Sequence, residues 1–338
     1  MRHVIHRKAW YLLALALLAQ GLVASILAQQ EKPSPTSDYQ YKKDYAEVEG
    51  IMKETDADQR ATKLTAFVKE HPQSRMIPYV WGYYQQILAE KEKAGAWDKV
   101  FSLHDQWIQL RADDTGAQKS LAAAYYRGKK LDKAAEMTEK LYAASKDKAM
   151  LGDLLAMYQQ LNNAEKYAAT ADLVIKEYPI EQSFGTAVQM AQIYAAKNDV
   201  AKASDYASKV LAAFGDKTPQ GVDEKAWNTT RVQLYSIVGA NEYAKKDCAR
   251  AVENYEKAAK IDVKNDIAHY QIAMCKWRSQ DLDAAMASFA RAVVLGKGTS
   301  KKAQEYLEQI YKPRHPEDAK LEGLDQLKAK AKSEVGAS

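Results

Sequence analysis

Glycine and proline are scarce in this sequence, which has 15 glycines and eight prolines among 338 residues. Both residues interrupt helices, so long stretches of the chain carry no helix breaker. An alternation of apolar and polar residues, which marks a half-buried strand, persists nowhere along the chain. The sequence therefore predicts an all-α fold.

The usual signatures of catalysis and cofactor binding are missing as well. The sequence has no HExxH pair, no GxSxG elbow and no glycine-rich phosphate loop. A carboxylate pair, Asp113 and Asp114, precedes an expected helix start at Thr115 and is interpreted as a helix cap. The histidines lack other metal ligands at close helical spacing; they are His3, His6, His71, His104, His269 and His315. We therefore expect no enzymatic activity, no cofactor and no metal site.

Neither sign of charge dominates, with 49 lysines and arginines against 44 aspartates and glutamates. Lysines alternate with acidic residues, as in Lys129 and Lys130 near Asp132, which is typical of a solvated helix face. The sequence therefore predicts no nucleic-acid partner.

The strongest apolar stretch lies at the N-terminus. Basic residues, among them Arg7 and Lys8, precede an apolar run over 9–27, and a polar stretch follows Ala28. This order is typical of a secretory signal peptide, so residues 1–28 are predicted to direct export to the periplasm or cell envelope. An uncleaved membrane anchor is the alternative, because the apolar run is nearly long enough to span a membrane. Residues 29–40, which include Pro33 and Pro35, are predicted to be a disordered linker.

Residues 232–295 carry two copies of one pattern, 34 residues apart. The first copy is Tyr235, Val238, Gly239, Ala251, Tyr255 and Ala258, and the second is His269, Ile272, Ala273, Ala285, Phe289 and Ala292. Each copy is expected to form two antiparallel helices, which cannot bury their apolar face alone and therefore stack on neighbours. Gly239 and Ala251 are expected where the two helices of one unit cross.

This pattern of small and aromatic positions resembles the tetratricopeptide repeat family. The resemblance covers 41–312, which is predicted to hold about six repeats, the first degenerate, and a loop insertion near 217–230 before a helix lengthened around Trp227. It implies a right-handed superhelical solenoid of antiparallel helix pairs. Residues 313–338 are predicted to be a C-terminal capping helix, starting at Glu317, and a tail; Leu321, Leu324 and Leu327 share one face of that helix.

In this family the first helices of the units line a groove that holds peptides or protein segments. The resemblance places eight candidate binding residues there: Lys119, Tyr126, Arg127, Gln192, Tyr243, Tyr270, Trp277 and Arg278. One variant of the family clamps acidic C-terminal tails with a lysine and an asparagine; Lys119 fits it, but Ala123 stands where asparagine is needed. We therefore expect a non-enzymatic scaffold that binds a different segment of a partner protein, because aromatic and arginine side chains contribute most of the binding energy in interfaces.

Two alternatives remain open. The chain could be a self-associating structural spacer that uses a face from Trp97 to Trp107, or, with less support, an enzyme or an enzyme subunit. The two cysteines also allow two interpretations. Cys248 and Cys275 are expected at similar height on two antiparallel helices of adjacent repeats, so they could form a disulfide in an oxidising compartment or stay as unpaired buried thiols.

Overall fold

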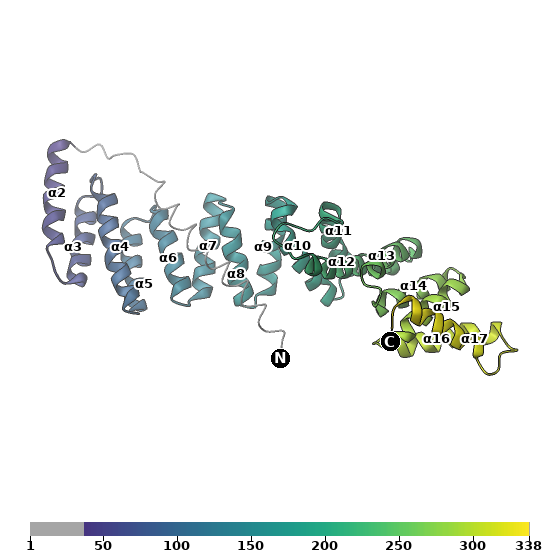
Figure 1. Ribbon diagram of the computed structural model, residues 1–338. Coiled ribbons are helices and arrows are strands. Elements are labelled where there is room, and N and C mark those ends of the chain that lie inside the picture. Colours follow the sequence, from purple (N-terminus) through teal and green to yellow (C-terminus); the bar gives the residue numbers. More distant parts are fainter. Residues whose placement is uncertain (1–36, 338) are drawn as a thin grey trace. The chain divides into compact units, whose positions relative to one another are not determined.

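The computed structural model describes residues 37–337, and in that range it consists of sixteen α-helices without a strand (Figure 1). The predicted signal peptide, 1–28, lies outside the described residues, as does most of the predicted linker. The chain divides into two compact units, 1–170 and 171–338, and the boundary falls inside one helix. Each unit is described by itself.

The first unit is a row of antiparallel helix pairs. Its helices are α2 (Asp38–Met52), α3 (Ala57–Glu70), α4 (Ile77–Lys93), α5 (Trp97–Leu110), α6 (Thr115–Arg127), α7 (Leu131–Ser145), α8 (Ala149–Gln160) and the start of α9 (Ala164–Glu177). Ser37 caps α2 by accepting a hydrogen bond from the Gln40 amide at 3.2 Å. The helix therefore begins three residues before the predicted start at Tyr41, and residues 38–40 are helix instead of linker.

The core of the first unit is rich in aromatic residues. Tyr84 and Trp107 are fully buried, and their rings lie 5.1 Å apart. The Tyr84 hydroxyl donates to the Leu103 carbonyl at 2.9 Å, and the Trp107 indole donates to Asp114 at 2.9 Å. Asp114 also caps α6, as predicted for the carboxylate pair. Trp107 therefore belongs to the interior, and the Trp97–Trp107 face does not offer it for self-association, contrary to the spacer interpretation.

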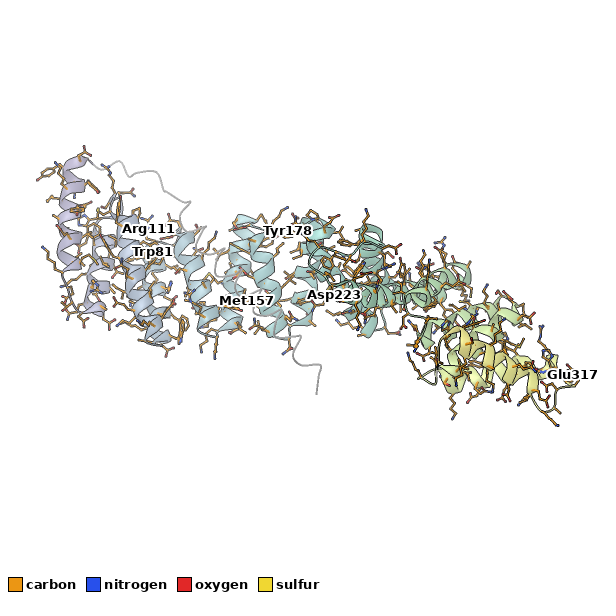
Figure 2. The ribbon with its side chains drawn as sticks, viewed as in Figure 1. Trp81, Arg111, Met157, Tyr178, Asp223 and Glu317 are labelled. Carbon is orange, nitrogen blue, oxygen red and sulfur yellow. The ribbon has the colours of Figure 1, made fainter. Side chains whose placement is uncertain are left out.

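The second unit continues the pairing. After the end of α9 it contains α10 (Ile180–Ala196), α11 (Val200–Phe214), α12 (Glu224–Ala244), α13 (Cys248–Ile261), α14 (Asp266–Arg278), α15 (Leu282–Val294), α16 (Ser300–Arg314) and α17 (Glu322–Glu334). The loop before α12 is shorter than predicted. Asp223, labelled in Figure 2, caps α12, so the helix already starts at Glu224, and it runs for 21 residues. Trp227 lies in the first turn of this lengthened helix and is 1% exposed.

Turns inside the pairs share one backbone conformation. One residue in each of six such turns has a positive φ, and only the first is a glycine: Gly95, Lys129, Asn162, Asn198, Lys246 and Gln280. Each of these residues lies two positions after the last residue of the first helix, where a left-handed conformation ends the helix. Several helices are capped by an aspartate or asparagine whose side chain accepts a hydrogen bond from a backbone amide; such caps are Asp56, Asp114, Asp199, Asp223, Asp247, Asn265 and Asp281. Three of them, Asp199, Asp247 and Asp281, directly follow a residue with a positive φ.

Close packing within a pair is clearest at Gly239. A Cβ atom there would lie 3.0 Å from two ring carbons of Tyr255. Gly239 belongs to α12 and Tyr255 to α13. The predicted crossing of the two helices at a small residue is therefore confirmed for this pair.

The C-terminal helices cover the last pair. Leu324 of α17 is fully buried in one cluster with Phe289 of α15 and Leu307 of α16, and Leu321 and Leu327 are half-buried there. Two predicted boundaries are wrong. Pro313 lies inside α16, and α17 begins at Glu322 instead of Glu317, because Asp318 accepts the Glu322 and Gly323 amides, both at 2.9 Å, and holds the preceding residues in a turn.

Seven helix pairs, α2–α3 to α14–α15, occupy the region predicted to hold about six repeats. The fold class is confirmed as an all-α array of stacked antiparallel helix pairs. Within residues 37–337, none of the helices is both long enough and apolar enough to cross a membrane.

Candidate partner-binding surfaces

All eight predicted binding residues lie on the first helices of their pairs. Lys119, Tyr126 and Arg127 belong to α6 and Gln192 to α10. The remaining four are Tyr243 on α12 and Tyr270, Trp277 and Arg278 on α14. The structure thus places three candidates in the first unit and five in the second, and the two surfaces are described separately.

On the first unit, the candidates are held by bonds between successive first helices. Arg127 forms a two-pronged ion pair with Glu92 of α4, with Nε and Nη2 at 3.0 and 2.7 Å from its two carboxylate oxygens. Gln160 of α8 donates to the Tyr126 hydroxyl at 3.2 Å. Such paired geometry fixes an arginine more firmly than a single contact does. Glu92 and Gln160 were not among the predicted residues, although Gln160 stands 34 after Tyr126.

A half-buried carboxylate belongs to the same surface. Asp153 of α8 stands 34 residues after Lys119, so it occupies the same place in the next pair. Burial, and secondarily the charge of Asp147, raises the pKa of Asp153 to about 6. The Lys119 Nζ atom lies 3.8 Å from a carboxylate oxygen of Asp147, so this lysine forms an ion pair with Asp147. The 34-residue offset could have identified Asp153, but its burial could not be read from the sequence.

On the second unit, the candidates Arg278 and Gln192 each contact a side chain of a neighbouring first helix. The guanidinium of Arg278 stacks 4.6 Å from the ring centre of Tyr243, and its Nη2 lies 3.3 Å from the Tyr243 hydroxyl. Gln192 donates to the side chain of Gln233 on α12 at 2.9 Å. Arg278 stands 35 residues after Tyr243, the same offset as Arg127 after Glu92. Both units therefore carry an arginine fixed against the preceding first helix.

Tyr270 and Trp277 lie in an aromatic cluster that also holds the pairs together. The Trp277 ring lies 5.2 Å from Tyr306 and 6.3 Å from Phe289, which is fully buried. Tyr270 lies 5.8 Å from Phe289 and 6.3 Å from Tyr306. Both candidates are half-buried, so they contribute to packing and offer only part of their surface to a partner. Tyr306 comes from α16, which follows the last helix pair and carries no copy of the 34-residue pattern, so the pattern did not select it.

The cysteines lie in contact as free thiols. Cys248 opens α13 and is half-buried, and Cys275 on α14 is buried. Burial, with a smaller contribution from a hydrogen bond to Cys248, raises the pKa of Cys275 to about 12. The predicted proximity of the two residues is confirmed, whereas their pairing as a disulfide stays a hypothesis.

The buried histidines take part in packing. His104 contacts the Val100 carbonyl at 2.9 Å and the Ser120 hydroxyl at 3.0 Å, and His269 contacts the Val263 carbonyl at 2.9 Å. Burial lowers the pKa of each imidazole, which favours the neutral form. These contacts join residues within or next to the helix pairs, so both histidines contribute to packing of the fold.

Two surface pockets of the second unit lie elsewhere. One, of about 870 Å³, is lined by residues of α9, α10 and α11, and the other, of about 580 Å³, by residues of α13, α14, α15 and α17. None of the eight candidates lines either pocket. The candidate residues therefore lie outside both pockets, on first helices, where Arg127, Gln192 and Arg278 are exposed and the other five are half-buried.

Comparison with known proteins gives a likeness of fold. No family model and no curated protein matches the sequence. A solved structure of Naa15/Naa10 bound to HypK-THB is similar at a TM-score of 0.50 and 12% identity, over 79% of this chain and 39% of that one. The TPR2AB domain of yeast Sti1 in a complex with pHSP90 has a TM-score of 0.34 and 16% identity, over 87% and 99%. A tetratricopeptide repeat protein of Parabacteroides merdae has a TM-score of 0.32 and 13% identity, over 80% and 98%.

Proposed function

We propose that this protein is a non-enzymatic scaffold that binds a segment of a partner protein on the first helices of its pairs. One observation carries the proposal: arginine and tyrosine side chains on these helices are fixed across neighbouring pairs before any partner arrives. Arg127 is held by Glu92, and Arg278 by Tyr243. Side chains that are already ordered lose less conformational entropy on binding, and arginine and tyrosine are common anchors of interfaces.

Exposure of the anchors supports the same function. Arg127 and Arg278 are exposed, and Tyr126 and Tyr243 are half-buried, so each presents donors or ring faces on the surface. Asp153 adds a half-buried carboxylate to the surface of the first unit. A segment that carries carboxylate or amide acceptors would meet the arginines, and a basic side chain would meet Asp153. A mixed peptide segment therefore fits better than a uniformly acidic tail.

Export belongs to the proposal as well. The order of charged, apolar and polar residues at the N-terminus supports a secretory signal, and a membrane anchor formed by the same residues is the alternative. In either case the repeats would act in the periplasm or at the cell envelope.

Site-specific photocrosslinking in cells tests the binding surfaces. A benzoylphenylalanine would replace Tyr126 or Tyr243 on the first helices, and control variants would carry it at Lys140 of α7 or Lys257 of α13. Both control side chains are solvent-exposed on second helices. We expect a defined partner band from the first two positions and none from the two controls.

Two results would contradict the proposal. Equal crosslinking from all four positions would show that binding does not use the first helices. Crosslinks only between copies of this chain would instead favour the self-associating spacer. Fractionation of the same cells, with the full chain detected by antibody, tests export independently: retention in the cytoplasm would refute it.

A further inference from the structure

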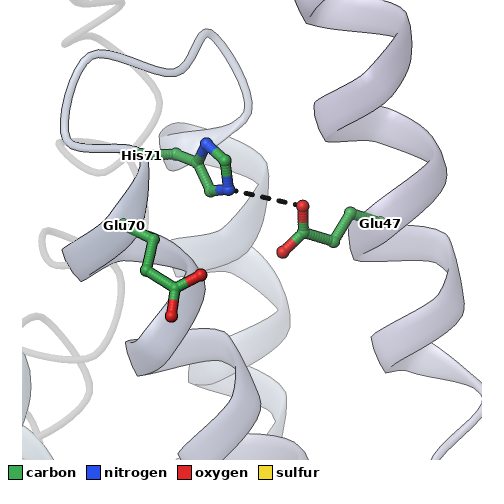
Figure 3. Close-up of side chains that lie close together, drawn as sticks. All are labelled: Glu47, Glu70 and His71. Atoms are coloured by element: carbon green, nitrogen blue, oxygen red, sulfur yellow. Dashed lines mark ion pairs between the residues drawn. The ribbon is translucent and has the colours of Figure 1, made fainter.

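Three potential metal ligands converge at the N-terminal end of the first unit (Figure 3). Glu47 belongs to α2, Glu70 is the last residue of α3, and His71 follows it directly. One ligand atom from each residue lies within 4.8 Å of the other two. The His71 Nε2 atom is 3.3 Å from a carboxylate oxygen of Glu47. Two helices thus bring together an imidazole and two carboxylates.

A buried carboxylate lies behind the imidazole, on the side of the ring away from Glu47. The Nδ1 atom of His71, on the opposite side of the ring from Nε2, lies 3.8 Å from Asp44, which is 1% exposed. Asp44 itself accepts hydrogen bonds from the side-chain amide of Gln40 at 2.7 Å and from the Ser74 hydroxyl. The ring of His71 also packs 4.7 Å from the ring centre of Phe67.

This arrangement is independent of the two exposed glutamates. A carboxylate behind one ring nitrogen is the usual support of a histidine whose other nitrogen binds a metal, because it fixes the tautomer and raises the basicity of the ligand. Asp44 is one of only two residues of α2 that are buried, the other being Val48. The fold therefore places a buried carboxylate 3.8 Å from the ring nitrogen that such a support would contact.

The ligand set indicates the class of ion. One imidazole nitrogen and two carboxylates suit a divalent transition-metal ion such as Zn²⁺, whereas Ca²⁺ and Mg²⁺ prefer oxygen ligands alone. Ligands of a tetrahedral Zn²⁺ ion lie about 3.3 Å apart. The His71 and Glu47 atoms already have this spacing, so binding would mainly need a shift of the Glu70 carboxylate. Glu47 and Glu70 are exposed and have flexible side chains, so their carboxylates can move that far.

We propose that Glu47, Glu70 and His71 bind a divalent transition-metal ion, with water completing the coordination. The ion would join α2 to the end of α3. Because α2 buries so little apolar surface, this link would stabilise the first helix pair. The spacing of the ligands explains why the sequence did not reveal the site: Glu47 lies 23 and 24 residues before Glu70 and His71, and only the helix pair brings them together.

Calorimetric titration of the full-length protein with Zn²⁺, after removal of bound metal, tests the proposal. We expect one ion per chain at this site and a loss of affinity of about tenfold or more in each of E47Q, E70Q and H71Q. The glutamates are exposed, so their variants should fold, and circular dichroism would verify it. Two variants serve as controls: H315Q, whose histidine lies 3.4 Å from Glu317, and the double variant H3Q/H6Q. Neither should change the affinity.

A second measurement distinguishes coordination by specific ligands from nonspecific electrostatic binding of the ion. Co²⁺ in place of Zn²⁺ should give visible absorption bands of tetrahedral coordination that disappear in H71Q. Unchanged Zn²⁺ affinity in the E47Q/E70Q double variant would overturn the proposal, as would loss of binding in either histidine control. Binding only at millimolar Zn²⁺, without the Co²⁺ bands, would mean an adventitious ion only.

Discussion

Gly239 shows how closely a single residue can be constrained in a helix pair. Alanine favours helices more than glycine does, yet its methyl group would lie 3.0 Å from the ring of Tyr255. We expect Gly239→Ala to lower the free energy of unfolding by about 1–3 kcal/mol, because the buried ring of Tyr255 would have to shift within the packed interior. Urea denaturation followed by circular dichroism measures the change.

Gly152 provides the matched control for this substitution. It lies in α8, is exposed, and has no atom within 4 Å of the place where a Cβ would stand. Gly152→Ala should therefore raise the free energy of unfolding by roughly 0.5–1 kcal/mol. A stabilising effect of the same size at Gly239 would contradict the close packing described here.

Asp153 makes stability depend on pH. Its pKa is raised to about 6, so the folded state holds the proton more tightly than the unfolded chain does, whose aspartates titrate near about 4. The protonated carboxyl therefore contributes to the free energy of unfolding. This contribution is fully present below about pH 4 and is lost as the pH rises through 6. Above that pH the charged carboxylate is a cost to folding.

Replacing Asp153 by asparagine removes this cost. We expect Asp153→Asn to raise the free energy of unfolding at pH 7.5 by about 1–2 kcal/mol, a figure reduced from the full pKa difference because the group is partly exposed. At pH 4.5 the gain should be much smaller. Urea denaturation at both pH values measures it, with Asp132→Asn on the exposed face of α7 as control. An equal gain at the two pH values would show that burial of the charge is not the cause.

Individual binding residues were partly predictable from the sequence. The 34-residue period placed Tyr126, Arg127, Tyr243 and Arg278 on first helices, where the structure has them. The period cannot show which neighbour holds each side chain, because Glu92 and Tyr243 differ in chemistry but support an arginine equally well. Nor can it show that Tyr270 and Trp277 pack against Tyr306, since α16 lies outside the repeat pattern.

At the scale of helices, the two cysteines offer a covalent link between α13 and α14. We expect oxidised glutathione to join them: the two thiols give up two protons and two electrons, and the reagent is reduced to two molecules of glutathione. Cys248 should react first, because it is the less buried thiol, whereas the pKa of Cys275 is raised to about 12.

Thiol titration of the unfolded, non-reduced protein measures the outcome. After oxidation the wild-type chain should show no free thiol, and the Cys248→Ser variant should keep one. Two free thiols in the wild type after prolonged treatment would contradict the link. The same titration on protein purified from its own compartment would decide whether the disulfide forms there.

Helix α17 should stabilise the last pair through one leucine. Leu324 is fully buried between α15 and α16, so Leu324→Ala should cost about 2–5 kcal/mol of local stability. Leu327 is only half-buried, and Leu327→Ala should cost clearly less. Hydrogen exchange of the amides in α15–α17 measures both. Equal protection in the two variants would mean that α17 is a loosely attached tail.

Boundaries of helices were the least predictable feature at this scale. Proline was expected to end α16, but Pro313 stands one residue before the end, and the helix stops at Arg314. The start of α17 moved from Glu317 to Glu322 because Asp318 binds two amides at the new start and accepts the Tyr311 hydroxyl at 2.7 Å. That hydroxyl comes from another helix, so no local pattern could have placed the boundary.

For the whole molecule, most of the correct predictions of the fold came from the 34-residue repeat period. Periodic small and aromatic residues identified the pairs, their order and their antiparallel stacking. They predicted about six repeats, whereas seven helix pairs occupy that region. Nor did they reveal the cluster of Glu47, Glu70 and His71, since a search along one helix cannot find ligands that two helices share.

The most extensive helix contacts in this fold are local: within the described range they join helices that are consecutive or one apart, as α3 with α5 and α15 with α17. Because these contacts are local, one helix pair can unfold while its neighbours stay folded. Pulled by its ends in an optical trap, it should therefore lengthen in several discrete steps instead of one. Each released pair of about 34 residues would add roughly 110–120 Å of contour. A single step over the full length would contradict this. The helix pairs that are still folded under load would keep the candidate binding residues on their first helices in place.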